Sequence, residues 1–130
     1  SVLVAEDNKV NHQVALRMLE AIDCVCVVVD NGRLAVEAVQ VGAYDLVLMD
    51  CQMPQMDGYE ATAAIRALED DRASIPIVAL TAEALPEDRG RCIDAGMDDY
   101  LSKPIDRAAL LETLTRIAEA AHEATRRAAS

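Results

Sequence analysis

The stretch Asp45-Leu46-Val47-Leu48-Met49-Asp50 decides the fold of this 130-residue chain. Four apolar residues in a row are typical of a strand that is buried on both faces of a parallel sheet. The run ends in an acid, Asp50, at the point where such a strand leads into a loop. In open α/β sheets, ligands bind in the crevice at the carboxyl ends of the strands. The stretch therefore predicts a parallel sheet and places Asp50 where a functional site is expected.

Strands and helices alternate along the rest of the chain. Apolar and β-branched runs predict four more strands, at residues 2–5, 24–29, 75–80 and 100–101. Helical spacing of apolar residues, together with Gly and Pro boundaries, predicts helices over about 10–22, 34–41, 61–68, 86–95 and 110–121. Alternating strands and helices form a parallel sheet with helices on both faces, so the sequence predicts a single doubly wound α/β domain.

The limits of this domain also follow from the pattern. We expect the domain to occupy residues 1–121 and the polar tail at 122–130 to be a frayed helix end. We expect Gly42 to end the second helix as a left-handed C-cap. The chain starts directly before a strand, as in a domain cut from a longer protein or a chain with a processed start.

The composition excludes several classes of partner. The chain carries 12 basic and 23 acidic residues, a net charge of -11, which argues against binding to nucleic acid or to an anionic membrane. The apolar runs are far too short to span a bilayer, and no signal-peptide pattern opens the chain. These features favour a cytoplasmic domain that makes no membrane contact.

The cysteines and histidines do not form a recognisable site in the sequence. None of the four cysteines has CxxC spacing, so we expect reduced thiols, most of them packed as small hydrophobic residues, with zinc or a disulfide as the less favoured alternative. We expect His12 and His122 to be solvated and to take no part in chemistry.

Polar groups follow four of the predicted strands. They are Glu6 and Asp7 after the first, Asp50 after the third, Thr81 after the fourth and Lys103 after the fifth. A pair of carboxylates at ~4 Å repel each other by about 4 kcal/mol at an effective dielectric constant near 20. Lys103 would offset part of this repulsion, and a hard divalent cation such as Mg²⁺, which prefers carboxylate oxygens, would offset more.

Such a site is suited to phosphoryl transfer. An ionised aspartate such as Asp50 can act as a nucleophile and form an acyl phosphate. Phosphoryl transfer depends mainly on positioning and on neutralisation of charge. Mg²⁺ held by Asp7 and Asp50, the Lys103 ammonium and the Thr81 hydroxyl would meet the phosphoryl oxygens.

Four motifs, in this order, resemble the receiver domain of two-component response regulators, and most closely the receivers of hybrid sensor histidine kinases. The resemblance runs from Val2 to about Ala120, and its motifs are Val4-Ala5-Glu6-Asp7-Asn8, Asp50-Cys51-Gln52-Met53-Pro54-Gln55-Met56-Asp57-Gly58, Ala79-Leu80-Thr81-Ala82 and Tyr100-Leu101-Ser102-Lys103-Pro104. It implies a flavodoxin-like fold with strand order 2-1-3-4-5.

The resemblance also implies a role for each site residue. Asp50 would be the phosphoacceptor, Thr81 and Tyr100 the switch pair, and Lys103 the phosphate-binding lysine. Mg²⁺ would be bound by Asp7 and Asp50 directly, by Glu6 through water and by the backbone carbonyl of Gln52. Phosphorylation is expected to draw in Thr81 and Lys103, and the change to reach Tyr100 and the helix at 86–95. The chain departs from many relatives at Ile22-Asp23-Cys24, where they have a glycine.

The partner implied by the family is a histidine kinase dimerisation domain or a histidine phosphotransfer protein. Its histidine-bearing helices would dock on a surface that consists of Asn11, Val14, Ala15, Met18, Pro104 and Ile105. Two alternatives remain open on the sequence. One is a protein-binding module that is never phosphorylated. The other is a Mg²⁺-dependent aspartyl-phosphate phosphatase, although no Asp-x-Asp motif or cap insertion supports it.

Overall fold

The sheet has five parallel strands in the order β2-β1-β3-β4-β5. The computed structural model describes residues 1–51, 53, 56–68, 71–81, 86–102 and 105–129. The strands are β1 (Val2–Ala5), β2 (Cys26–Val29), β3 (Leu46–Asp50), β4 (Ile77–Thr81) and β5 (Asp99–Ser102). The strand order and the doubly wound α/β class predicted from the sequence are confirmed.

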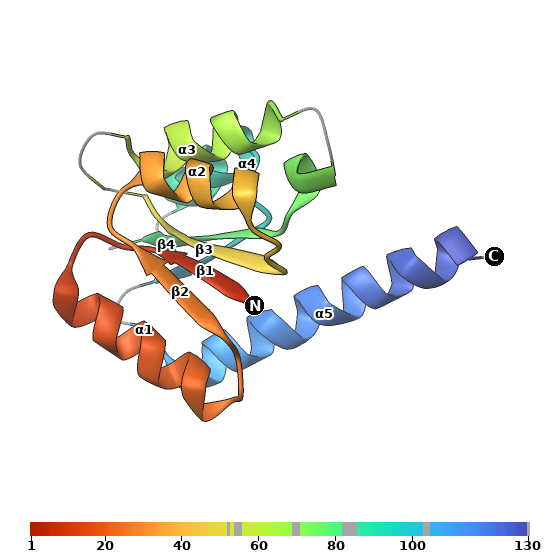
Figure 1. The fold of residues 1–130 in the computed structure, drawn as a ribbon, viewed down its shortest axis with the longest axis horizontal. Helices are drawn as coiled ribbons and strands as arrows, with labels where there is room; N and C mark the ends of the chain where they lie inside the picture. Colours follow the sequence, from red (N-terminus) through yellow and green to blue (C-terminus); the bar gives the residue numbers. More distant parts are fainter. Residues whose placement is uncertain (52, 54–55, 69–70, 82–85, 103–104, 130) are drawn as a thin grey trace.

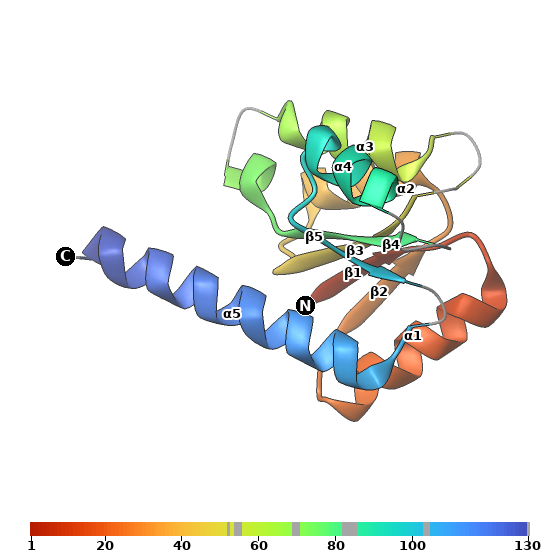
Figure 2. The ribbon, with the colours of Figure 1, turned by 180° about the vertical axis from the view of Figure 1, so that it is seen from behind.

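Helices cover both faces of this sheet (Figure 1). They are α1 (Lys9–Ala21), α2 (Gly32–Val41), α3 (Gly58–Arg66), α4 (Pro86–Ala95) and α5 (Arg107–Ala129), with a short 3-10 helix, η1 (Asp71–Ser74), before β4. The helices α2, α3 and α4 lie on one face, and α1 and α5 on the other (Figures 1 and 2). In the part of the chain that the structure describes, no helix combines the length and the apolar character needed to cross a bilayer.

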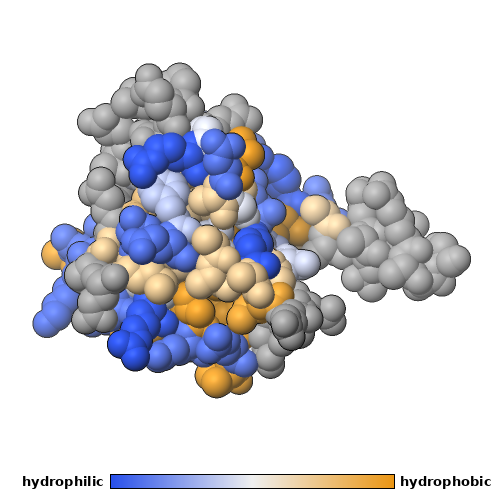
Figure 3. Space-filling view, turned by 90° about the horizontal axis from the view of Figure 1, so that it is seen from above, coloured by the Kyte–Doolittle hydropathy of each residue, from blue (hydrophilic) through white to orange (hydrophobic). Residues whose placement is uncertain are grey.

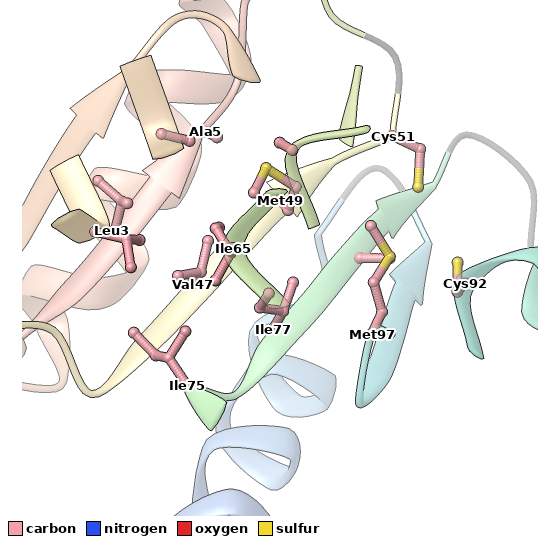
Figure 4. Packing of buried hydrophobic residues seen from close by; sticks show 14 residues of the cluster. Leu3, Ala5, Val47, Met49, Cys51, Ile65, Ile75, Ile77, Cys92 and Met97 are labelled. Carbon is pink, nitrogen blue, oxygen red and sulfur yellow. The ribbon is translucent and has the colours of Figure 1, made fainter. Parts of the chain in front are cut away.

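Each face of the sheet has its own apolar core because successive strand residues point to opposite sides. Leu3, Val47, Met49 and Ile77 pack under α2, α3 and α4 (Figure 4). Val4, Leu48, Val78 and Leu80 pack under α1 and α5. Strand β3 is buried at all five positions, as its continuous apolar run predicts. Figure 3 looks down on the α2–α4 layer, where hydrophilic and hydrophobic residues are interspersed at the surface.

Two helix ends differ from the sequence predictions. Gly42 ends α2 with φ -110 and ψ 168, so it is not the left-handed cap that we expected. Its lack of a side chain serves close packing, because a Cβ there would lie 2.6 Å from the Tyr44 ring. The last helix, expected to end near residue 121, continues to Ala129, and it projects beyond the sheet in Figures 1 and 2.

Candidate functional site

Three acidic side chains meet at the carboxyl ends of β1 and β3. Parallel pairing sets Ala5 of β1 beside Met49 of β3, so the residues that follow, Glu6 and Asp50, are also neighbours. Carboxylate atoms of Glu6, Asp7 and Asp50 lie within 4.8 Å of one another. The residues Glu6 and Asp50 are only 0% and 3% exposed, whereas Asp7 is exposed. The structure thus brings together the acids that the strand ends predicted.

The Glu6 carboxylate is fixed by the start of α1. Its Oε1 accepts hydrogen bonds from the Asn8 backbone N–H at 3.2 Å and from Asn11 Nδ2 at 3.3 Å. Asn8 is in turn the N-cap of α1, since its side chain accepts from the backbone N–H groups of Val10 and Asn11. One short turn therefore places a buried acid and begins the helix that follows it.

The backbone at Asp50 is held from two sides. The N–H of the next residue, Cys51, donates to Leu80 of β4 at 3.2 Å, and its carbonyl accepts from Gly58 at 3.1 Å. Gly58 begins α3 immediately behind Asp50, and a capping box formed by Asp57 and Glu60 stabilises that helix start. The main chain on either side of the loop is thereby fixed by β4 and α3.

This donor set fits a hard divalent cation. Carboxylate oxygens are the ligands that Mg²⁺ prefers, and three carboxylates so close together repel one another unless positive charge is nearby. Among the residues that the structure describes, Glu6, Asp7 and Asp50 are the one group of three His, Cys, Asp or Glu side chains placed to hold a metal ion.

The Thr81 hydroxyl is the next polar group along this edge. Thr81 is the last residue of β4 and is 4% exposed, and its Oγ1 has no hydrogen-bond partner within the described residues. A buried hydroxyl without a partner is uncommon in native proteins, so the group is available to an incoming acceptor. Tyr100 lies on β5 beside Ala79 and packs, half-buried, against the core under α3 and α4.

Four of the predicted docking residues line one pocket. Asn11, Val14 and Ala15 of α1 and Ile105, just before α5, surround it together with Val4, Glu6 and Leu80. Met18, one turn further along α1, packs half-buried on the core of the same face. The remaining predicted site residues, Gln52, Lys103 and Pro104, lie outside the described residues.

Sequence reasoning missed a thiol pair beside Asp50. The thiols of Cys51 and Cys92 are in hydrogen-bonding contact, and the Tyr59 hydroxyl also bonds to Cys51. Burial raises the pKa of Cys51 to about 12, which keeps it a thiol and unreactive. All four cysteines are reduced, as predicted.

The position of His12 also differs from expectation. We predicted a solvated side chain, but its Nε2 is buried and has no hydrogen-bond partner among the described residues. The helical pattern places His12 away from the main apolar stripe of α1, so the sequence alone gave no sign that this ring nitrogen is buried.

The fold and the acidic cluster together define a flavodoxin-like α/β domain with carboxylates placed to hold a metal ion at the carboxyl edge of its sheet. The response regulator receiver domain model matches residues 2–115. The chain belongs to this family, the receiver domains of two-component and phosphorelay systems.

Its curated relatives include hybrid histidine kinases. The sensor protein GacS of Pseudomonas syringae pv. syringae is 47% identical over 117 residues, which cover 88% of this chain and 13% of that protein. Hybrid signal transduction histidine kinase B of Dictyostelium discoideum is 44% identical over 120 residues, or 85% of this chain and 6% of that protein. The chain thus spans a small part of these relatives.

Two solved structures bear on the site. The receiver domain of sensor histidine kinase PA1611 from Pseudomonas aeruginosa PAO1 has a magnesium ion coordinated in its active site cleft. It is 46% identical, with a TM-score of 0.82, over 88% of this chain and 93% of that one. The Saccharomyces cerevisiae receiver domain of Ssk1, in complex with the histidine phosphotransfer protein Ypd1, is 32% identical, with a TM-score of 0.82, over 88% of this chain and 85% of that one.

Proposed function

We propose that this domain accepts a phosphoryl group on Asp50 from a phosphohistidine of a partner protein and thereby switches a signalling surface. The observation that carries the proposal is the cluster of Glu6, Asp7 and Asp50, in which a buried carboxylate lies beside two others. In the transfer, an Asp50 carboxylate oxygen bonds to phosphorus as the phosphorus–nitrogen bond breaks. The bonding electrons stay on the imidazole nitrogen, which takes up a proton.

Other residues of the chain would bind the metal ion and contact the phosphoryl oxygens. Glu6, Asp7, Asp50 and the Gln52 carbonyl would hold Mg²⁺, which supplies positive charge against the phosphoryl oxygens when it is bound. The Thr81 hydroxyl and the Lys103 ammonium would meet other phosphoryl oxygens. The buried hydroxyl of Thr81, which lacks a partner among the described residues, supports this assignment. Movement of Thr81 toward the phosphoryl group would leave space for Tyr100 to turn inward.

The proposed partner surface is the pocket between α1 and the start of α5. A histidine phosphotransfer protein or kinase dimerisation domain would place its helices against Asn11, Val14, Ala15, Met18, Pro104 and Ile105. Support comes from the pocket that four of these residues share with Glu6, since a partner seated there is also close to the acids. The chemistry requires a histidine phosphorylated from ATP, so the proposal places the domain in the cytoplasm.

Incubation with acetyl phosphate and Mg²⁺, followed by intact mass spectrometry, tests the proposal. The wild type is expected to gain the mass of one phosphoryl group, and hydroxylamine, which cleaves acyl phosphates, is expected to remove it. EDTA and Asp50→Asn should abolish the gain. Asp45→Asn is the matched control, because Asp45 lies just before the same strand with its side chain 86% exposed, and it should label as the wild type does.

Other outcomes would favour the alternatives. Equal labelling of Asp50→Asn would refute the assignment of Asp50. No labelling of any variant would favour a module that is never phosphorylated. Release of many phosphates per protein from a small phosphomonoester would favour a phosphatase.

A further inference from the structure

A second polar group lies on the other side of Asp50, between α3 and α4. Cys51 follows Asp50 and is 6% exposed, and Cys92 of α4 is 1% exposed. Figure 4 shows their sulfur atoms pointing toward each other from the end of β3 and from α4. Tyr59, in the first turn of α3, bonds to Cys51 through its hydroxyl. The guanidinium of Arg91 on α4 lies 4.5 Å from the centre of the Tyr59 ring.

Cys51 lies at the centre of this group, because its thiol is hydrogen-bonded both to the Tyr59 hydroxyl and to the Cys92 thiol. A chain of hydrogen bonds thus runs from α3 through the residue next to Asp50 to α4, and the Arg91–Tyr59 contact joins the two helices directly.

These contacts fix the middle of α4, whereas its C-terminal end is held separately. Arg66 of α3 donates from Nε to the Gly96 carbonyl at 2.8 Å, and from Nη2 to Asp98 at 2.9 Å. A shift of α4 away from α3 would therefore break the Arg91 and Cys92 contacts first. The Arg91 contact is made with Tyr59 itself, and the Cys92 contact is made with the Cys51 thiol to which Tyr59 is hydrogen-bonded.

We propose that Tyr59 is a positioning residue that holds α4 against the Asp50 loop in the unphosphorylated domain, and that it is released when Asp50 is phosphorylated. The inference rests on the proposed function. In this proposal, Tyr59 on α3, which is not one of the switch residues Thr81 and Tyr100, resists the shift of α4.

Hydrogen exchange of the α4 amides, with and without beryllofluoride and Mg²⁺, tests this role. Beryllofluoride mimics an aspartyl phosphate and is expected to speed exchange in wild-type α4. Tyr59→Phe keeps the ring and removes the hydroxyl, and should speed α4 exchange about fivefold without beryllofluoride, as expected for one lost hydrogen bond. The further acceleration by beryllofluoride should shrink, because the restraint is already gone.

Two variants of Arg91 and two control variants complete the comparison. Arg91→Met should act in the same direction by about two- to fivefold, and Arg91→Lys should recover part of the effect. Tyr44→Phe removes a hydroxyl from another partly buried tyrosine, located beside Gly42. Arg33→Met removes an exposed arginine of α2. Both should leave α4 exchange unchanged.

The ratio of the exchange rates with and without beryllofluoride decides the question. If Tyr59→Phe speeds exchange equally in both states, the ratio stays at the wild-type value, Tyr59 is only structural, and the inference is wrong. If beryllofluoride alters no part of the wild-type domain, the proposed function fails and the inference fails with it. Because that result appears in the wild type before any variant is made, the two failures are distinguishable.

Discussion

At the scale of single residues, the position of the Asp50 backbone depends on a glycine, Gly58. Gly58 begins α3 against the Asp50 backbone, and a Cβ there would overlap the Asp50 carbonyl oxygen and lie 3.0 Å from the Cys51 Cα. The neighbouring atoms are backbone atoms of a buried strand end, which cannot move aside without shifting Asp50. Close approach of two backbones therefore requires glycine at this position.

Gly58→Ala is predicted to lower the free energy of unfolding by about 1–3 kcal/mol, the usual cost of overpacking, and to slow labelling of Asp50 by acetyl phosphate. Urea unfolding and the labelling rate are the measurements. Gly90→Ala is the control, since no atom lies within 4 Å of a Cβ at this exposed position in α4. It should stabilise the domain by about 1 kcal/mol through helix propensity. A Gly58→Ala protein as stable and as quickly labelled as the wild type would contradict this account.

The sequence predicted which acids would meet, because the carboxyl ends of parallel strands share one edge of the sheet. It did not predict the contacts of Tyr59 and Cys92. These side chains lie on α3 and α4. Which of their residues touch depends on how the two helices pack together, and the apolar pattern of the sequence carries no information about that packing. The burial of the His12 Nε2 atom was also not predicted.

At the scale of elements, the strand and helix pattern was predicted well and the boundaries less well. Helix α4 has the predicted bounds, set by Pro86 at its start and Gly96 after its end. Strand β2 begins at Cys26 and not at residue 24, because the Cys24 N–H donates to the Leu19 carbonyl and closes the end of α1. Asp23 lies between them with φ 60, in the left-handed region, and completes a Schellman motif through its own N–H bond to Glu20.

Asp23→Gly is predicted to raise the free energy of unfolding by about 0.5–1 kcal/mol, because a side chain is disfavoured in the left-handed region. Asp23→Ala keeps a Cβ and loses the tolerance of aspartate for this conformation, so it should be no more stable than the wild type. Paired urea unfolding curves measure both changes. A destabilised Asp23→Gly protein would show that the aspartate has a stabilising role beyond its backbone conformation.

At the scale of the whole molecule, the net charge of -11 and the cluster of Glu6, Asp7 and Asp50 both favour the binding of cations. A negative domain attracts cations in general, but the buried cluster of Glu6, Asp7 and Asp50 offers one place where a divalent cation has several ligands. Binding to the folded state alone then stabilises the domain.

Mg²⁺ at 100 times its dissociation constant is predicted to raise the free energy of unfolding by about 2.7 kcal/mol. Asp7→Asn should lose most of this gain. Asp45→Asn, which removes an acid at the far end of β3, should keep it. Urea unfolding in Mg²⁺ and in EDTA gives the difference, and equal stabilisation of all three proteins would mean that Mg²⁺ acts on the general charge and not at the cluster.

The most direct test of the central claim locates the phosphoryl group. Borohydride reduces an aspartyl phosphate to homoserine, which peptide mass spectrometry identifies at a single position. After labelling with acetyl phosphate and Mg²⁺, the account predicts homoserine at position 50 and at no other acid. Homoserine at position 7 or 57, or none in a protein that has gained phosphate, would contradict it.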